Sequence, residues 1–321
     1  MVTLKQVEEG QVGCYLVALL AGLLLGAFLP TSGLLLEAWI EPVLAVLLYA
    51  MFAQIPFLQL RAAFSHWRFM SALCVANFII VPLLVWVLTR FLPNEPPLVI
   101  GVTLVLLAPC IDYVVVFTHL GRGNAKLVLA ATPLLLLLQI ILIPVYLWLI
   151  VGEAAASLFK AGPLLRAFLI LIAVPLACAV LTEWLSARHR LARQWHAATA
   201  WLPVPVMALV LFIIVASQVP KISGHLWLIA SAVPAYIAFM LIMPLVAKYV
   251  ALGFQLETGA GRALVFSAST RNSLVVLPLA FALPDPMRTL VAAVIVTQTL
   301  VELLGELIYV KLVPKLVTDP D

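Results

Sequence analysis

Four ionisable side chains lie well inside long apolar stretches of the sequence: Asp112, Arg271, Glu302 and Glu306. In a bilayer each would cost several kcal/mol unless it were paired or solvated, so residues of this kind mark functional sites. Asp112 and Arg271 carry opposite charges, and each stands where an apolar stretch is interrupted. We therefore expect their side chains to face each other and form an ion pair. The sequence leaves open whether the pair is permanent and structural, or opens when a substrate or proton binds.

A second polar group follows near the end of the chain. Gln298, Glu302 and Glu306 recur every four residues, which places them on one face of a helix. An apolar environment disfavours a charged carboxylate, so Glu302, the deeper acid, is the candidate proton carrier, with Asp112 as a second one. Glu306 is expected at the membrane interface. Gly305 is expected to let a neighbouring backbone approach closely.

Cys110 follows a proline at the first interruption. A buried thiol usually behaves as a small apolar side chain, but next to a helix break its sulfur would be a soft ligand for a thiophilic solute. Both interpretations stay open. The chain's 4 cysteines show no metal-ligand spacing and no disulfide framework. The candidate substrate-binding residues are Cys110, Asp112, Arg271 and Asn272.

The two interruptions occupy residues 108–112 and 267–273. In the first, Pro109 removes a backbone donor and clashes with the preceding turn. In the second, a run of small polar residues competes for backbone hydrogen bonds. Interrupted helices at corresponding places in two halves of a transporter indicate a binding site in the middle of the membrane.

The composition explains why these elements must lie in a bilayer. Of the 321 residues, 65% are hydrophobic and only 10% are charged, whereas soluble domains contain about half and a quarter. At about 20 residues for each membrane span, the chain holds about ten spans. The first is expected to be a retained helix and not a signal peptide. The predicted spans cover 12–29, 38–55, 69–92, 97–119, 127–150, 163–184, 198–219, 227–250, 262–283 and 289–310.

The predicted fold is an all-α polytopic membrane protein with ten transmembrane helices, forming one transporter domain over residues 1–321. Its halves, 1–155 and 156–321, are expected to be inverted five-helix repeats whose broken fourth and ninth helices cross in mid-membrane. With ten spans, most of the 18 Lys and Arg residues fall in loops and termini on the same side of the membrane as the N-terminus. Basic residues are enriched in cytoplasmic segments, so both termini are predicted to lie in the cytoplasm, with the chain in the cell membrane.

The sequence lacks the motifs of several soluble classes. It has no P-loop, no H-E-x-x-H, no dinucleotide fingerprint and no nucleophile elbow. We therefore expect neither an enzyme nor a bound cofactor, and no catalytic residue is assigned. No basic patch carries interleaved aromatic residues, so no nucleic acid partner is expected.

Residues 109–124 (PCIDYVVVFTHLGRGN) resemble the bile acid/sodium symporter superfamily, whose Arg-Gly-Asn loop falls at the same distance from the proline. Within it, Cys110-Ile111 and the valines that follow are similar to the arsenical-resistance-3 type arsenite permeases, which also carry a cysteine at this break. Val301-Glu302 resembles their Ile-Glu motif, whose glutamate is essential. The resemblance implies a core of spans 3–5 and 8–10 and a panel of spans 1, 2, 6 and 7.

The chain departs from this pattern in the ninth span. Symporters of the superfamily carry Glu-x-x-x-Gln-Asn there, and its side chains bind sodium, but this chain has Ser267, Arg271 and Asn272. The fourth-span Ser-Asn pair is replaced by Val114 and Val115. A sodium ion would lack ligands and meet a fixed positive charge. The sodium site is therefore predicted to be absent, and no other metal is expected.

A second departure concerns the charged pair itself. Arsenite permeases carry a small residue in place of Asp112 and asparagine in place of Arg271. The two changes compensate in charge, which supports the pairing. They also open the question of substrate, because a guanidinium could bind an anion through two hydrogen bonds.

The leading interpretation is a proton-coupled exporter of arsenite or a related metalloid that works by alternating access. Cys110 would bind the solute, Glu302 would carry the counter-moving proton, and Asp112 and Arg271 would gate the site. The alternative is a sodium-independent organic anion transporter with Arg271 as counter-ion, and a further one is a membrane receptor that transports nothing. The expected partners are a small solute (arsenite, antimonite or a small organic anion), protons and the lipid bilayer, with the protein a monomer or homodimer.

Overall fold

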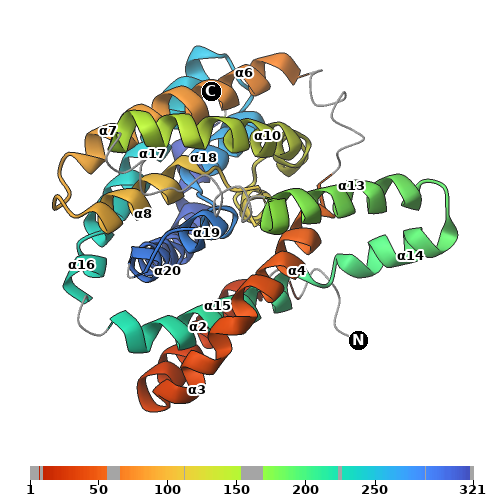
Figure 1. Cartoon of the computed structure of the whole chain (residues 1–321). Helices are drawn as coiled ribbons and strands as arrows, with labels where there is room; N and C mark the ends of the chain where they lie inside the picture. The colour runs from red at the N-terminus through yellow and green to blue at the C-terminus, as the bar shows by residue number, and fades with distance from the viewer. Residues whose placement is uncertain are drawn as a thin grey trace. The chain divides into compact units, whose positions relative to one another are not determined.

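The computed structural model describes residues 7, 10–55, 66–111, 113–152, 169–222, 226–285 and 287–318, which are helical over most of their length (Figure 1). The chain divides into two compact units, each described by itself below. Unit 1 comprises Met1–Leu58, Phe159–Trp227 and Leu277–Ala293, and unit 2 comprises Gln59–Leu158, Leu228–Val276 and Val294–Asp321.

Eight helical segments of the described residues are long and apolar enough to cross a bilayer, judged by length and composition. They correspond to eight of the predicted spans, although the second predicted span begins earlier, the seventh, 198–219, begins later and the last runs further than predicted. Residues 163–168 of the sixth predicted span lie outside the described residues. The two remaining predicted spans, 97–119 and 262–283, are the two that contain a break. The segments are Gln11–Phe28, Pro30–Phe52, Trp67–Thr89, Ala125–Val151, Leu169–Ser186, Pro203–Pro220, Leu226–Gly253 and Met287–Leu316.

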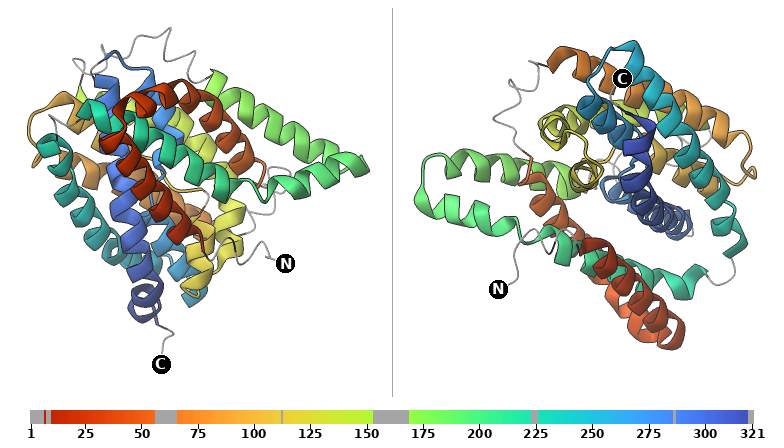
Figure 2. Two further views of the ribbon diagram at one scale, coloured as in Figure 1. Left: turned by 90° about the horizontal axis from the view of Figure 1, so that it is seen from below. Right: turned by 180° about the vertical axis from the view of Figure 1, so that it is seen from behind.

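Unit 1 is built on close packing of α2 (Gln11–Phe28) against α15 (Pro203–Ile222), which lie side by side in Figures 1 and 2. A Cβ on Gly22 would lie 2.7 Å from the carbonyl oxygen of Phe212, and one on Gly26 would lie 2.8 Å from that of Ala216. Small residues four apart thus let the two backbones touch, as in helix pairs within membranes. The other elements of this unit are α3 (Pro30–Leu35), η1 (Leu36–Trp39), α4 (Ile40–Phe52), η5 (Leu169–Ala173), α13 (Val174–Ser186) and α14 (Arg190–Thr199).

Helix α14 lies almost wholly between two predicted spans, and only its last two residues fall within the predicted span 198–219. It packs against α13 and is tied to α4 and the residue after it by side chains. The Trp195 indole N–H donates to the Tyr49 hydroxyl (2.8 Å), and the His196 ring Nε2 lies 2.8 Å from the carbonyl oxygen of Ala53. A polar connection between two spans is therefore itself helical.

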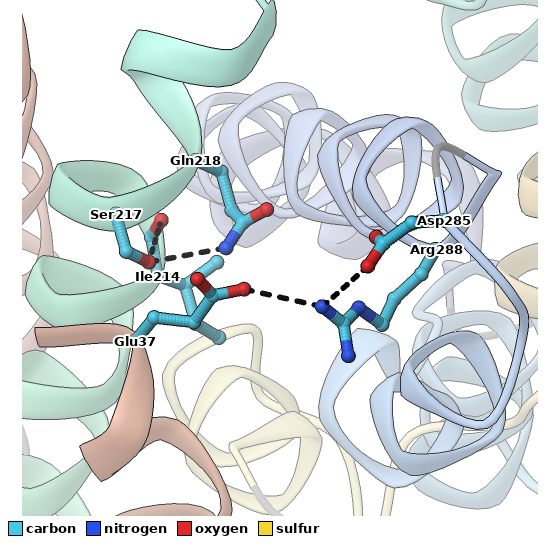
Figure 3. A network of polar contacts seen from close by, with 6 residues as sticks. All are labelled: Glu37, Ile214, Ser217, Gln218, Asp285 and Arg288. Atoms are coloured by element: carbon cyan, nitrogen blue, oxygen red, sulfur yellow. Dashed lines mark hydrogen bonds and ion pairs between the residues drawn. The ribbon is translucent and has the colours of Figure 1, made fainter. Parts of the chain in front are cut away.

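An acid at the start of the second predicted span has a partner in the same unit (Figure 3). The Arg288 guanidinium lies 3.4 Å from Glu37 and 2.9 Å from Asp285. On α15 nearby, Gln218 donates to the hydroxyl of Ser217 over 3.2 Å. The Arg288 and Glu37 side chains are about a third exposed, and pairs of this kind contribute at most about 1 kcal/mol.

Both helix breaks lie in unit 2, although the second half of the later broken helix continues into unit 1. The broken helix 97–119 consists of α8 (Pro96–Leu107) and α9 (Val114–Leu120), and the broken helix 262–283 of α18 (Thr258–Ser269) and α19 (Ser273–Phe281). Helix α8 packs on α7 and α10, and α18 packs on α17 and α9. The remaining elements are α6 (Trp67–Val75), η4 (Ala76–Ile80), α7 (Val81–Thr89), α10 (Ala125–Val151) and α17 (Val233–Gly253), with α16 (Leu226–Ala230), α19 and α20 (Met287–Leu316) continuing from one unit into the other.

Candidate substrate and coupling site

The two unwound segments of unit 2 run side by side as extended chain. Pro109 and Arg271 lie opposite each other in an antiparallel bridge. The Cys110 N–H donates to the Thr270 carbonyl over 3.2 Å, and the Asn272 N–H donates to the Ala108 carbonyl over 2.8 Å. The predicted helix breaks are therefore present, and in this unit they contact each other directly.

The second break is shorter than predicted. Residues 267–269 remain helical, and only residues 270–272 leave the helix. The first of these, Thr270, has φ −101° and ψ 133°. Its extended backbone pairs with the other break, which satisfies backbone groups that have no helical partner.

The side chain of Arg271 is wholly enclosed. Its Nη2 donates to the carbonyls of Ser267 (2.9 Å) and Ala268 (2.7 Å), and its Nη1 donates to that of Leu106 (3.3 Å). These carbonyls belong to the last turns of α18 and α8, where the helix provides no donor and the dipole is negative. The guanidinium is thus a fixed cation bonded to the C-terminal ends of two half-helices.

A π-helical turn supplies one more partner of Arg271. Asn77, in η4, accepts a bond from Nη2 of Arg271 over 2.8 Å. Four residues after Phe78 comes Pro82, which has no N–H to give to the Phe78 carbonyl. The Tyr146 hydroxyl donates to that carbonyl instead, over 2.5 Å. π-Turns are frequent at functional sites, and this one carries the side chain that meets the guanidinium.

The expected partner of Arg271, Asp112, lies outside the described residues, so the predicted ion pair stays a prediction. The Phe239 ring lies 5.4 Å from the guanidinium carbon, within reach of a cation–π contact. Among the described residues the Arg271 Nε has no hydrogen-bond partner.

Glu302 meets the unwound backbone. Its Oε2 accepts from the Arg271 backbone N–H over 2.8 Å and from the Gln298 amide. Its Oε1 accepts from the Tyr113 hydroxyl over 2.6 Å. Three donors therefore converge on one buried carboxyl group, which fixes α20 to both breaks.

Glu306 is not the interfacial residue that we predicted. Its side chain is fully buried, and its Oε1 lies 2.6 Å from the Thr270 hydroxyl. Position near the end of an apolar stretch does not determine exposure, because the unwound chain at Thr270 covers this turn of α20. Gln298, Glu302 and Glu306 do share one buried face, as their spacing predicts. Gly305 meets a side chain instead of backbone, since a Cβ there would lie 2.0 Å from the Met240 Cε.

Cys110 is fully buried at the first break, and Asn272 ends the second. The Asn272 side-chain oxygen accepts from the N–H groups of Leu274 and Val275, each over 3.1 Å. It therefore caps the first turn of α19. Its Nδ2 has no partner among the described residues.

Sequence reasoning missed three residues that build this site. Asn77 and Tyr113 were not proposed as partners of Arg271 and Glu302, and Thr270 was noted only as part of a polar run. For Asn77 the sequence contains a signal. It is an amide inside an apolar stretch, five residues before a proline, and such a proline disrupts the regular backbone hydrogen bonds of a helix. Tyr113 and Thr270 gave no comparable signal.

Two comparisons with known proteins bear on this geometry. The sequence profile described as the Sodium Bile acid symporter family matches residues 41–225. A curated protein of Pseudomonas aeruginosa, itself described as uncharacterized, is 26% identical over 179 residues, which are 54% of this chain and 54% of that protein. The chain thus spans about half the length of this relative. The profile match ends before α17, so Arg271 and Glu302 lie outside it.

Proposed function

The chain belongs to the sodium bile acid symporter family, and from this premise we propose a sodium-independent secondary transporter that exports arsenite or a related metalloid in exchange for protons. Members of this family are membrane solute transporters and not enzymes. What we propose beyond the family is that the solute is a metalloid, that it is exported and that protons are the coupling ion. Its support comes from the side chains around the two helix breaks of unit 2.

The proposed architecture is ten helices in two inverted repeats with a core and a panel. Eight long apolar helices and two interrupted ones support the number ten. Unit 2 gathers the predicted spans 3–5 together with most of 8–10, and unit 1 gathers 1, 2, 6 and 7. This grouping supports movement of a core against a panel as the route of alternating access.

The observation that carries the proposal is the position of the Arg271 guanidinium. Carbonyl oxygens at the ends of broken helices are the groups that coordinate a cation in many transporters. Here the Ser267, Ala268 and Leu106 carbonyls already bond a cation that belongs to the chain. A sodium ion at this place would be repelled by that charge. The transporter therefore takes its driving force from another ion, and the buried carboxyl groups of α20 favour the proton.

The choice of a thiophilic solute depends on Cys110. Its thiol stands at the point where the two breaks are hydrogen-bonded, and sulfur is a soft ligand suited to trivalent arsenic or antimony. Asn272 Nδ2, at the opposite break, is a donor for an oxygen of the same solute. Binding would form a sulfur–arsenic bond in place of the S–H bond and one arsenic–oxygen bond, and the thiol proton and that hydroxide would leave as water. A neutral solute would therefore bind without a net change of charge.

A small organic anion with Arg271 as counter-ion is the alternative substrate. The contacts of Arg271 give it less support, because Nη1 and Nη2 already donate to four acceptors of the chain. Among the described residues Nε has no hydrogen-bond partner, but the side chain is fully enclosed, so the break would have to open before an anion could reach that N–H. A receptor that moves no solute has no observation in its favour.

The test is a binding and flux screen of the purified full-length chain in detergent and in proteoliposomes. Arsenite, antimonite and a small carboxylate and sulfonate are compared, for wild type and Cys110→Ser. The expected result is flux of arsenite and antimonite that falls at least about tenfold in Cys110→Ser. Flux of the carboxylate or sulfonate that survives Cys110→Ser would replace the metalloid proposal with the anion one, and no flux of any solute would contradict transport of these classes.

A further inference from the structure

We propose that Glu306 is a proton-binding site, and that its carboxyl group, protonated in the conformation described, donates a hydrogen bond to the Thr270 hydroxyl at the second helix break. The role of this proton in coupling rests on the proposed function. The site itself rests on the geometry alone.

Counting hydrogen atoms around Thr270 gives the first argument. Its Oγ1 lies 2.6 Å from the Phe266 carbonyl oxygen and 2.6 Å from Glu306 Oε1. A hydroxyl group has one proton to donate, and neither a carbonyl nor a carboxylate has any. With Glu306 ionised, one of these two short oxygen–oxygen contacts would contain no proton. With a proton on Glu306, the chain from Glu306 through Thr270 to the Phe266 carbonyl is complete.

A comparison of the two acids on α20 gives the second argument. Glu302 accepts from the donors of Tyr113, Arg271 and Gln298. The Tyr113 hydroxyl also lies 3.1 Å from the Arg271 carbonyl, but the bond to Glu302 is the shorter at 2.6 Å. Glu306 is equally buried, yet its Oε2 has no partner among the described residues. A buried carboxylate without donors is far more costly than a neutral carboxyl group.

Charge balance gives the third argument. Among the described residues that are buried, those of ionised type are Arg271, Glu302 and Glu306. Among the described residues, the titratable groups that interact with Glu306 are Glu302 and Tyr309, both on α20. Arg271 is adjacent in sequence to Thr270, the hydrogen-bond partner of Glu306. The net charge of one cation and two carboxyl groups is zero only when one of the carboxyl groups holds a proton. Asp112 lies outside the described residues, and its variant below tests whether it holds the proton instead.

Loss of the proton from Glu306 would change the hydrogen bonds at the second helix break. When Glu306 loses its proton to water, Thr270 has to turn its own proton from the Phe266 carbonyl toward the new carboxylate. The last turn of α18 then loses a side-chain hydrogen bond at the residue where the helix ends. Protonation of Glu306 is in this way linked to the geometry of the break that carries Arg271.

The site can be tested without a substrate. Infrared difference spectra of the purified protein, recorded between low and high pH in light and heavy water, report the C=O stretch of a protonated carboxyl group. We expect one buried carboxyl band that is lost in Glu306→Gln and kept in Glu302→Gln and Asp112→Asn. Thr270→Val should shift the band and Thr270→Ser should leave it in place. A band that persists in Glu306→Gln, or one that disappears in Asp112→Asn, would overturn the inference.

A second measurement separates this inference from the proposed function. Arsenite flux in proteoliposomes is measured with and without a pH gradient for wild type and Glu306→Gln. For the variant, the ratio of the two rates falls to about 1, because an amide carries no exchangeable coupling proton. If the infrared band follows Glu306 but wild type moves no arsenite, the proton site stands and the metalloid proposal fails. If arsenite flux responds to pH equally in both proteins, Glu306 is not the coupling site.

Discussion

The carboxylate of Glu302 accepts its hydrogen bond from the backbone N–H of Arg271, over 2.8 Å. The guanidinium of the same arginine donates instead to carbonyls at the ends of α8 and α18. One residue therefore joins three elements: its backbone to α20, and its side chain to two half-helices. Because these bonds share one residue, a change in Glu302 is transmitted to the break itself.

Glu302→Gln should abolish solute flux while the protein still folds. The amide keeps the size of the side chain, but only its oxygen accepts, so it cannot take all three hydrogen bonds from Tyr113, Gln298 and the Arg271 backbone as the carboxylate does. Each hydrogen bond to a charged group contributes about 1.5–3 kcal/mol, so thermal unfolding in detergent should occur at a lower temperature. Glu257→Gln, at an exposed acid of the same unit, is the control. Full flux in Glu302→Gln would remove this residue from the mechanism.

Arg271→Gln should destabilise unit 2 by about 3–5 kcal/mol, the cost of removing one member from a buried charged network. Arg271→Lys should recover less than half of that loss, because an ammonium lacks the planar fork that reaches carbonyls of two helices. Equilibrium unfolding in detergent measures both variants. Arg288→Gln, a partly exposed arginine, should change stability by no more than about 1 kcal/mol. Equal stability of Arg271→Lys and wild type would contradict the role given to the guanidinium.

The sequence predicted the positions of the breaks, because proline and a cluster of small polar residues act locally on helix bonding. It also predicted the shared face of Gln298, Glu302 and Glu306, which follows from helix geometry. The burial of Glu306 and the carbonyl partners of Arg271 were not predictable, since both depend on which segment lies against α20 or α8. Helix α14 was missed because its residues are polar and fitted a loop between spans.

Gly26→Ala should destabilise unit 1 by about 1–3 kcal/mol, as other overpacked positions do. The added methyl group would lie 2.8 Å from the Ala216 carbonyl oxygen and 3.0 Å from a side-chain carbon of Val219. Gly13→Ala is the matched control on the same helix, because nothing lies within 4 Å of its added carbon. It should be neutral or stabilising, by up to about 1 kcal/mol, through the higher helix propensity of alanine. Equal effects of the two changes in thermal unfolding would argue against close packing of α2 on α15.

Cys110→Ser should reduce arsenite flux at least about tenfold, since the hydroxyl is a hard ligand where a soft one is needed. Cys178→Ser should leave flux unchanged, because that thiol is exposed on α13 of the other unit. Labelling gives a second readout: a maleimide should modify the buried Cys110 slowly, and Cys14 and Cys178 serve as reference thiols in the same protein. Arsenite in the buffer should slow Cys110 labelling further and leave the rates at the other two unchanged.

The most direct test of the account is the identity of the driving ion for arsenite flux in proteoliposomes. A pH gradient with choline replacing all sodium, and a sodium gradient at uniform pH, are imposed in separate experiments. Because Arg271 supplies the cation at the broken helices, the account predicts uphill arsenite movement under the pH gradient and none under the sodium gradient. Uphill movement that requires sodium would contradict it.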